Sequence, residues 1–178
     1  MLDPAFLEQI KSALSYNPET GVLTWRGLTG SKKFRNGTQA GMLLQRKGKP
    51  NRYRLKLNNQ WLSGSRVAYI LMLGQDVPAG FMLDHRDRDA TNNRWDNLRL
   101  ATSSQNNANR VQKRRAPAAV GLPPGVGICS EGYYRVLITK DNRVVFEAKR
   151  RDLAAAKELA AAQSLKFHGE FSPYYQLS

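Results

Sequence analysis

The chain has 178 residues, with 28 Lys and Arg against 14 Asp and Glu, which gives a formal net charge of +14 and a pI near 10.3. No apolar run approaches the roughly 20 residues that span a bilayer, and the N-terminus lacks the pattern of a secretory signal. We therefore expect a cytoplasmic globular protein that does not enter membranes and binds a polyanion, foremost double-stranded DNA.

The few soft ligands in the sequence restrict the metals that it could bind. There is one cysteine, Cys129, and there are two histidines, His85 and His168. These numbers exclude an internal disulfide and argue against a structural zinc site. Any catalytic metal should be a hard cation bound through oxygen, Mg²⁺ or Mn²⁺.

The first half of the chain predicts an α+β arrangement. Helical spacing favours helices over 3–16 and 64–73, and short alternating runs favour strands over 22–25, 42–45 and 53–57. The last of these strands has apolar residues on one face, while Arg52, Arg54 and Lys56 fall on the other. That basic face fits either a solvated strand surface or a contact with DNA phosphates. The basic residues of this region that we expect at the DNA are Arg46, Lys47, Arg52, Arg54 and Lys56.

The middle of the chain predicts a strand, a loop, a strand and a helix. A strand over 81–83 should deliver Asp84 and His85 into a polar loop, and a second strand is expected over 97–101. Thr102 to Gln105 has the form of a helix capping box, with a helix to about residue 114. The stretch from Ser103 to Val126 contains no acidic residue and has four more basic residues expected at the DNA: Arg110, Lys113, Arg114 and Arg115.

The C-terminal part predicts a second, smaller unit. Residues 116–124 are rich in Pro, Ala and Gly and are the expected linker between a domain of residues 1–115 and one of residues 125–178. Strands over 132–140 and 143–149, joined at Asp141 and Asn142, should pack with a third strand on an Ala-rich helix that begins near Asp152.

His85 is a candidate general base because its ordinary pKa, about 6.5, lies near neutrality. The adjacent Asp84 offers an anionic metal ligand, and Asn106 lies in the first turn of the next helix, where its oxygen could complete a metal site. His85 could also be an ordinary surface histidine in an acidic loop, with Asp87 and Asp89 nearby. We expect His168 only to end a helix.

Four short segments resemble the HNH endonucleases, whose catalytic unit is the ββα-metal fold. They are Leu83 to His85, Asn93-Arg94, Asn97 to Arg99 and Gln105-Asn106, with the core of the motif over 83–110. The likeness is to homing-type HNH proteins common in bacteriophages and mobile introns, so a phage-encoded protein would act in the host cytoplasm. In place of a His-Arg pair frequent in the family, the chain has Ser65-Arg66.

The resemblance implies a role for each matched residue. His85 would activate water, Asp84 and Asn106 would hold one divalent ion, and Asn97 would brace the loop that presents His85. Beside these residues, we also expect Arg94 and Arg99 to contact DNA. With one such site in the chain a nick is the simpler product and a monomer the simpler state, although the oligomeric state is not readable from the sequence.

Residues 123–175 resemble the ethylene-response-factor type of DNA-binding domain, in which a three-stranded sheet lies in the major groove. The likeness is carried by segments 125–127, 133–138, 154–156 and 169–171 together with Phe146. It implies DNA contacts from Tyr133, Arg135, Arg143 and Lys149, although a basic α/β packing module would look similar.

These features favour a site-selective DNA endonuclease. Two other functions stay open: a DNA-binding regulator that keeps the fold but does not cut, and an RNA-binding protein, which would need exposed aromatic residues on a sheet.

Overall fold

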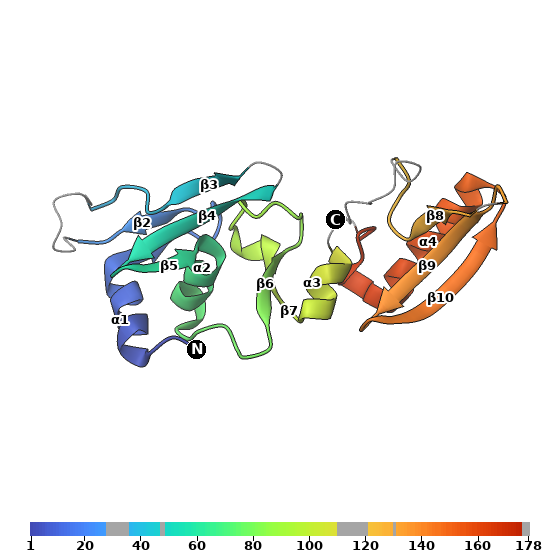
Figure 1. Cartoon of the computed structure of the whole chain (residues 1–178). Coiled ribbons are helices and arrows are strands. Elements are labelled where there is room, and N and C mark those ends of the chain that lie inside the picture. Colours follow the sequence, from blue (N-terminus) through green and yellow to red (C-terminus); the bar gives the residue numbers. More distant parts are fainter. Residues whose placement is uncertain (28–35, 47–48, 110–120, 130, 176–178) are drawn as a thin grey trace. The chain divides into compact units, whose positions relative to one another are not determined.

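The computed structural model describes residues 1–27, 36–46, 49–109, 121–129 and 131–175. The chain separates into two compact units, Met1–Ala101 and Thr102–Ser178 (Figure 1). Both contain helices and strands, as an α+β chain should. The division falls before the expected linker at 116–124, of which only 121–124 lie in the described part. Its physical reason is that helix α3 (Ser103–Asn109) packs among the C-terminal elements, where the Ser104 hydroxyl accepts a hydrogen bond from the Asp141 amide at 3.1 Å.

The first unit opens with helix α1 (Pro4–Ala13), capped by the side chain of Asp3. We predicted a helix as far as Tyr16, but residues Leu14–Tyr16 form strand β1, which pairs with β2 (Leu23–Trp25). The reason is the turn that follows: Pro18 disfavours a helical Asn17, and the Asn17 amide donates to the Val22 carbonyl at 3.0 Å. The end of the predicted helix, Leu14–Tyr16, therefore belongs to this hairpin as strand β1.

A three-stranded antiparallel sheet in the order β3-β4-β5 forms the centre of this unit. Its strands are β3 (Met42–Arg46), β4 (Lys49–Leu57) and β5 (Gln60–Ser63). Strand β5 was not predicted. Asn58 and Asn59 have φ angles of 44° and 64°, the left-handed geometry of a two-residue hairpin turn, and they return the chain along β4.

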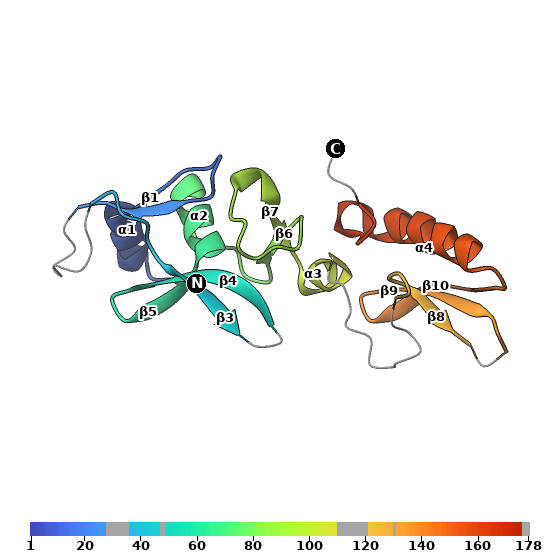
Figure 2. The same ribbon diagram turned by 90° about the horizontal axis from the view of Figure 1, so that it is seen from above.

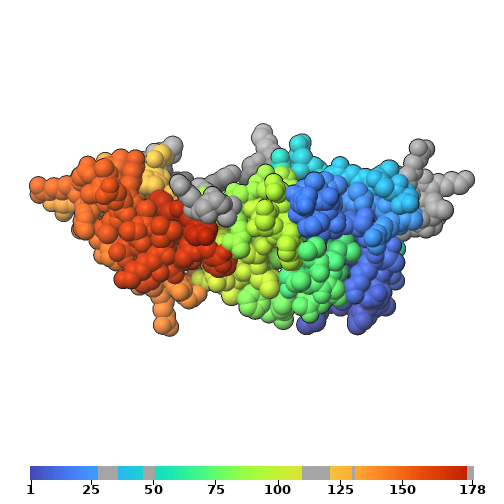
Figure 3. Space-filling view, turned by 180° about the vertical axis from the view of Figure 1, so that it is seen from behind, coloured from blue at the N-terminus to red at the C-terminus, as the bar shows by residue number. Residues whose placement is uncertain are grey.

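Helix α2 (Gly64–Leu73) has the bounds predicted for it. It starts after the capping side chain of Ser63 and ends at Gly74, which has a φ angle of 72°. Both α1 and α2 lie on one face of the β3-β4-β5 sheet (Figure 2). Helix α1 also packs against α2, seen in Figure 3 as dark blue against green. The side chains between them make the core, which includes Ile10, Leu14, Leu23, Leu55, Val67 and Ile70.

A separate two-stranded sheet follows in the first unit, made of β6 (Met82–His85) and β7 (Leu98–Ala101). The short helix η1 (Trp95–Asn97) immediately precedes β7. We expected Asp84 and His85 in the loop, but both still pair with β7, and the chain leaves the sheet at Arg86.

The second unit is a three-stranded antiparallel sheet with one long helix. The strands are β8 (Val126–Ile128), β9 (Tyr134–Lys140) and β10 (Arg143–Arg150), in the order β10-β9-β8. The expected turn at Asp141 and Asn142 is confirmed by their φ angles of 51° and 61°. Helix α4 (Leu153–His168) is capped by Asp152, lies along one face of the sheet (Figure 2) and leads into η3 (Gly169–Phe171).

Alternation along β9 holds the second core together. Val136 and Ile138 are buried on one face and Arg135 is exposed on the other. The small side chains of Ala156 and Ala160 are fully buried and let α4 approach the sheet closely. Within the part of the chain that the structure describes, no helix has the length and apolarity needed to cross a membrane.

Candidate active site and nucleic-acid surfaces

Asp84 and His85 point to opposite faces of β6 because they are neighbours in a strand. The Asp84 side chain is directed into the protein and is buried. His85 is half-buried, and its Nε2 lies 3.2 Å from the Oδ1 atom of Asn93. The chain therefore separates an inward carboxylate from a more accessible imidazole.

The buried carboxylate of Asp84 forms an ion pair with Arg99, its cross-strand neighbour. Arg99 Nη2 lies 2.8 Å and Nε 2.9 Å from the same oxygen, Oδ2, and both side chains are less than a tenth exposed. We expected Arg99 at the DNA. Its guanidinium instead lies inside the first unit, because the register of β6 and β7 places it beside the Asp84 carboxylate. A buried guanidinium is not positioned to contact DNA.

Asn97 stabilises the loop between β6 and β7 through hydrogen bonds. Its Oδ1 accepts from the Asp87 amide at 3.0 Å, and its Nδ2 donates to Asp87 Oδ1 at 2.9 Å and to the Asn92 carbonyl at 2.8 Å. Its own carbonyl accepts from the Arg86 amide at 2.9 Å. Because Asn97 is buried and ties together both ends of the loop, it fixes the path of the chain on leaving His85.

Within the same loop, Asp89 makes a local turn with Thr91. The Thr91 hydroxyl donates to the Asp89 carboxylate at 2.7 Å and the Thr91 amide at 2.9 Å. These hydrogen bonds lower the pKa of Asp89, and the charge of His85 lowers it further. Asp89 is therefore ionised at neutral pH and adds negative potential near His85.

Asn106, the second expected metal ligand, lies in α3 of the second unit, half-buried. The helix begins with the predicted capping box: the Gln105 amide donates to the Thr102 hydroxyl at 3.3 Å, and the Thr102 amide donates to Gln105 Oε1 at 2.8 Å. Asp84 of the first unit carries a carboxylate, and Asn106 of the second unit carries an amide oxygen. This donor chemistry fits Mg²⁺, which prefers oxygen ligands and retains several waters. In the described ranges, no three or more His, Cys, Asp or Glu side chains form a cluster able to hold a metal ion.

The outer face of β4 is basic, as predicted. Leu55 and Leu57 are buried on the inner face, and Arg52 and Lys56 are exposed on the other. The sequence reasoning missed Trp61 of β5, which is 48% exposed and has the Arg54 guanidinium carbon 3.6 Å from its ring centroid. The signal was present in the sequence, because the Asn58-Asn59 turn sets Trp61 opposite Lys56, on the same face as Arg54.

The other expected DNA contacts are distributed over both units. Arg94 is exposed, 3.5 Å from Asp96 in the first unit, whereas Arg143 and Lys149 are exposed in the second unit. Arg135 is exposed but forms an ion pair with Glu147 at 2.8 Å. The side chains of Arg46, Lys47, Arg110, Lys113, Arg114 and Arg115 lie outside the described residues.

Tyr133 immediately precedes β9 and is half-buried. Its hydroxyl accepts from Arg151 Nε at 2.9 Å, and the Arg151 guanidinium lies 5.2 Å from its ring centroid. Arg151 was not among the predicted residues, since a position just after a strand carries no periodic signal.

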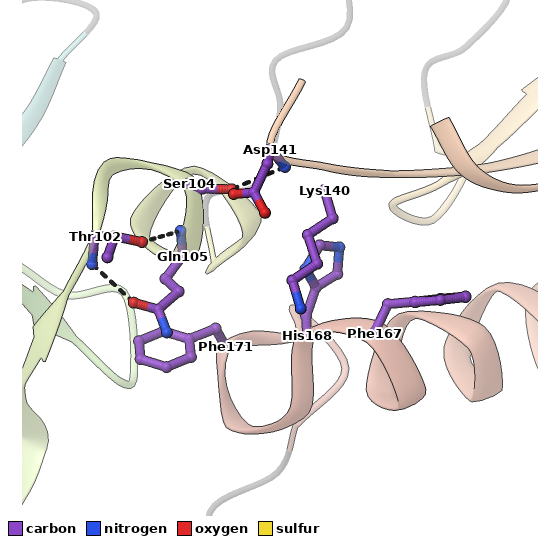
Figure 4. A pocket seen from close by; sticks show the side chains of 8 residues that line it. All are labelled: Thr102, Ser104, Gln105, Lys140, Asp141, Phe167, His168 and Phe171. Atoms are coloured by element: carbon purple, nitrogen blue, oxygen red, sulfur yellow. Dashed lines mark hydrogen bonds between the residues drawn. The ribbon is translucent and has the colours of Figure 1, made fainter. Parts of the chain in front are cut away.

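The second unit also contains a pocket of about 270 Å³ between the start of α3, the β9–β10 turn and the end of α4 (Figure 4). Its lining consists of Thr102, Ser104, Gln105, Lys140, Asp141, Phe167, His168 and Phe171. Burial and the nearby Lys140 charge lower the pKa of His168, against the opposing effect of Asp141. His168 ends α4, as expected from the sequence.

Residues 65–108 match the family model of the HNH endonucleases. This segment runs from α2 to α3 and contains all four residues of the candidate active site: Asp84, His85, Asn97 and Asn106. Comparisons with curated proteins and with solved structures gave no match. The HNH match supports a nuclease with DNA as its substrate. It does not reach residues 125–178, where the likeness to ethylene-response-factor domains stays an expectation.

Proposed function

We propose that the protein is a site-selective endonuclease that hydrolyses DNA with His85 as the general base. The observation that carries this proposal is the match of residues 65–108 to the HNH endonucleases, together with the half-buried His85 at the end of β6, beside a loop that Asn97 braces. A general base needs both a pKa near the working pH and a fixed position relative to the attacking water. His85 takes the proton from that water, while Asn97 holds the loop.

A divalent ion would be held by Asp84 and Asn106, with Mg²⁺ or Mn²⁺ as the candidates. When bound, it would stabilise negative charge on the scissile phosphate and on the leaving 3′ oxygen.

DNA binding in this proposal uses three groups of side chains. The outer face of the β3-β4-β5 sheet supplies Arg52, Arg54 and Lys56, with Trp61 as an apolar contact beside them. Arg94 lies in the loop between β6 and β7, just before η1. The C-terminal sheet, in the manner of the ethylene-response-factor domains it resembles, reads the site through Tyr133, Arg135, Arg143 and Lys149.

One observation favours a second candidate, a DNA-binding regulator that keeps the fold but does not cut. Asp84 Oδ2 is in contact with a buried arginine, 2.8 Å from Arg99 Nη2, and an ion pair reduces the negative charge that attracts a metal ion. Binding of DNA without any metal-dependent cutting would support this candidate.

The proposal is tested by incubating supercoiled plasmid and phage-type DNA with the protein in Mg²⁺, Mn²⁺ or EDTA. We expect open-circle product with either metal and none in EDTA, and the ratio of open circle to linear DNA separates nicking from double-strand cutting. A parallel Mg²⁺ titration compares Asn106→Ala with Asn107→Ala, its exposed neighbour in α3. Only the first should need more Mg²⁺ for half-maximal cutting, and an equal response of the two variants would remove Asn106 from the metal site.

A further inference from the structure

The neighbour of the His85 ring is the side chain of Asn93, which is only 4% exposed. Asn93 Oδ1 lies 3.2 Å from His85 Nε2, and Asn93 Nδ2 lies 3.4 Å from the Thr91 carbonyl, to which it donates. Turning the amide over would set its oxygen against that carbonyl oxygen, so the orientation with Oδ1 toward His85 is the one that satisfies both contacts.

This orientation selects one tautomer of a neutral His85 ring. Because Asn93 Oδ1 can only accept, His85 Nε2 must donate and therefore carries the proton. The acceptor lone pair of such a ring is then on Nδ1. Asn93 thus determines both the plane of the imidazole and the nitrogen that can take a proton from water.

Asn93 is itself held by parts of the chain far away in sequence. The Tyr16 hydroxyl in β1 donates to the Asn93 carbonyl at 2.7 Å. Burial and the nearby Asp96 charge raise the pKa of Tyr16 to about 12, so this hydroxyl stays a donor throughout the neutral range. Next to it, the Trp95 amide donates to the Pro18 carbonyl at 2.9 Å.

Two glycines pack directly on Asn93. A Cβ atom at Gly21 would lie 2.6 Å from the Asn93 carbonyl carbon, and one at Gly64 would lie 2.9 Å from Asn93 Nδ2. Gly21 has a φ angle of +73°, which would favour glycine in any case. Gly64 is in the first turn of α2 with an ordinary φ, so its missing side chain has a packing reason: it leaves room for the Asn93 amide.

We infer that Asn93 is a positioning residue for His85, and that parts of the chain before residue 65 hold Asn93 against the imidazole. This inference rests on the proposed function and assigns a role to β1, the turn at Pro18 and the start of α2. These segments lie before residues 65–108, the part that matches the HNH endonucleases.

The tautomer can be measured without any cutting of DNA. The chain has two histidines, so long-range ¹H–¹⁵N correlation spectra contain two imidazoles, which His168→Ala separates. At about pH 8.5 we expect His85 to show protonation on Nε2. Asn93→Ala and Gly64→Ala should each turn this pattern into a mixture of tautomers. Gly127→Ala is the matched control, because a Cβ there meets no atom closer than 3.9 Å.

Kinetics and stability distinguish positioning from mere folding. Gly64→Ala keeps Asn93 in the sequence but forces its amide away from His85, because the new Cβ atom would lie 2.9 Å from Asn93 Nδ2. It also puts a better helix former in α2, so it should not lower the melting temperature through the helix itself. We expect both Asn93→Ala and Gly64→Ala to lower kcat about 10-fold or more, by less than the roughly 100- to 10,000-fold of a lost general base. KM should stay within about twofold, because the loss arises in the transition state.

A wild-type His85 protonated on Nδ1 would overturn the inference, whether or not the variants fold. So would an unchanged tautomer together with an unchanged kcat in folded Asn93→Ala and Gly64→Ala. If the wild-type protein does not cut DNA at all, the proposed function fails, while the spectra still decide whether Asn93 orients His85.

Discussion

At the scale of single residues, the site is organised by buried polar side chains that each have a partner. Asp84 pairs with Arg99, Asn97 ties the loop, and Asn93 contacts His85. The motif in the sequence was enough to select Asp84, His85 and Asn97 as candidate site residues. The sequence did not predict the side chains that contact Asp84 and His85. The ion pair of Asp84 with Arg99 depends on the register of β6 and β7, and the contact of His85 with Asn93 depends on a loop path that distant elements set.

Replacing Arg99 by Met should therefore cost stability. A buried carboxylate left without its arginine typically destabilises a protein by about 3 to 5 kcal/mol. Urea unfolding followed by circular dichroism measures this loss in Arg99→Met, with Arg94→Met as the control, because Arg94 is exposed and lies 3.5 Å from Asp96. We expect the control to change stability by less than about 0.5 kcal/mol. Equal unfolding midpoints for the two variants would contradict a stabilising role of the Asp84–Arg99 pair.

At the scale of secondary-structure elements, the β3-β4-β5 sheet has helices on one face and a basic face opposite. Period-two alternation predicted that face along β4. It did not predict β5, since four residues with one buried position make a weak strand pattern. Helix α2 was predicted with its bounds from its apolar spacing and from Gly74 at its end, and the structure adds the capping side chain of Ser63 at its start.

The stacking of Arg54 on Trp61 leads to a prediction about DNA binding. Trp61→Ala removes an apolar contact and the surface that orders Arg54, so we expect the DNA affinity to fall about 5- to 30-fold, equivalent to roughly 1 to 2 kcal/mol. The dependence on salt should stay unchanged, whereas Arg54→Ala should reduce the slope of log K against log salt by about 1.

Fluorescence anisotropy with labelled DNA over a range of NaCl concentrations gives both quantities. Met72→Ala is the control, because Met72 is 39% exposed on α2 and belongs to no proposed DNA contact. An affinity of Trp61→Ala equal to that of the control would exclude the outer face of this sheet from the DNA interface.

At the scale of the whole molecule, the sequence indicated two units with a boundary after residue 115, whereas the structure divides the chain before α3. The capping box at Thr102 correctly predicts where α3 begins, yet no local pattern tells to which unit a helix belongs. That depends on tertiary partners, such as the hydrogen bond from the Asp141 amide to Ser104.

In the first unit, the buried carboxylate of Asp76 accepts four hydrogen bonds from three residues. It accepts from the Leu2 amide at 2.7 Å, from the Val77 amide at 2.8 Å and from the guanidinium of Arg66, whose Nη2 lies 2.6 Å away. Arg66, first among these, holds the pKa of Asp76 at about 2, below its ordinary value of 3.8. This contact also gives Arg66, the residue after Ser65, a structural role.

The pH dependence of stability follows from that shift. A carboxyl whose pKa is lower in the folded state contributes stability that is complete above its unfolded pKa, near 3.8, and lost as the pH falls toward 2. After allowance for the partial exposure of Arg66, the contribution is about 1 to 2 kcal/mol. Melting curves between pH 6 and pH 2 should show a smaller decrease for Asp76→Asn than for the wild type. The exposed Asp96→Asn should follow the wild-type curve, and parallel curves for all three proteins would refute the role given to Asp76.

In the proposed function, this protein cuts DNA and His85 is the base. The most direct measurement compares wild type, His85→Ala and His168→Ala in Mg²⁺-dependent cutting and in binding of the same DNA. We predict that His85→Ala binds normally but loses cutting by at least about 100-fold, and that His168→Ala cuts like the wild type. Cutting by His85→Ala at the wild-type rate would contradict the assignment of the base, and tight binding with no cutting by any of the three proteins would favour the regulator.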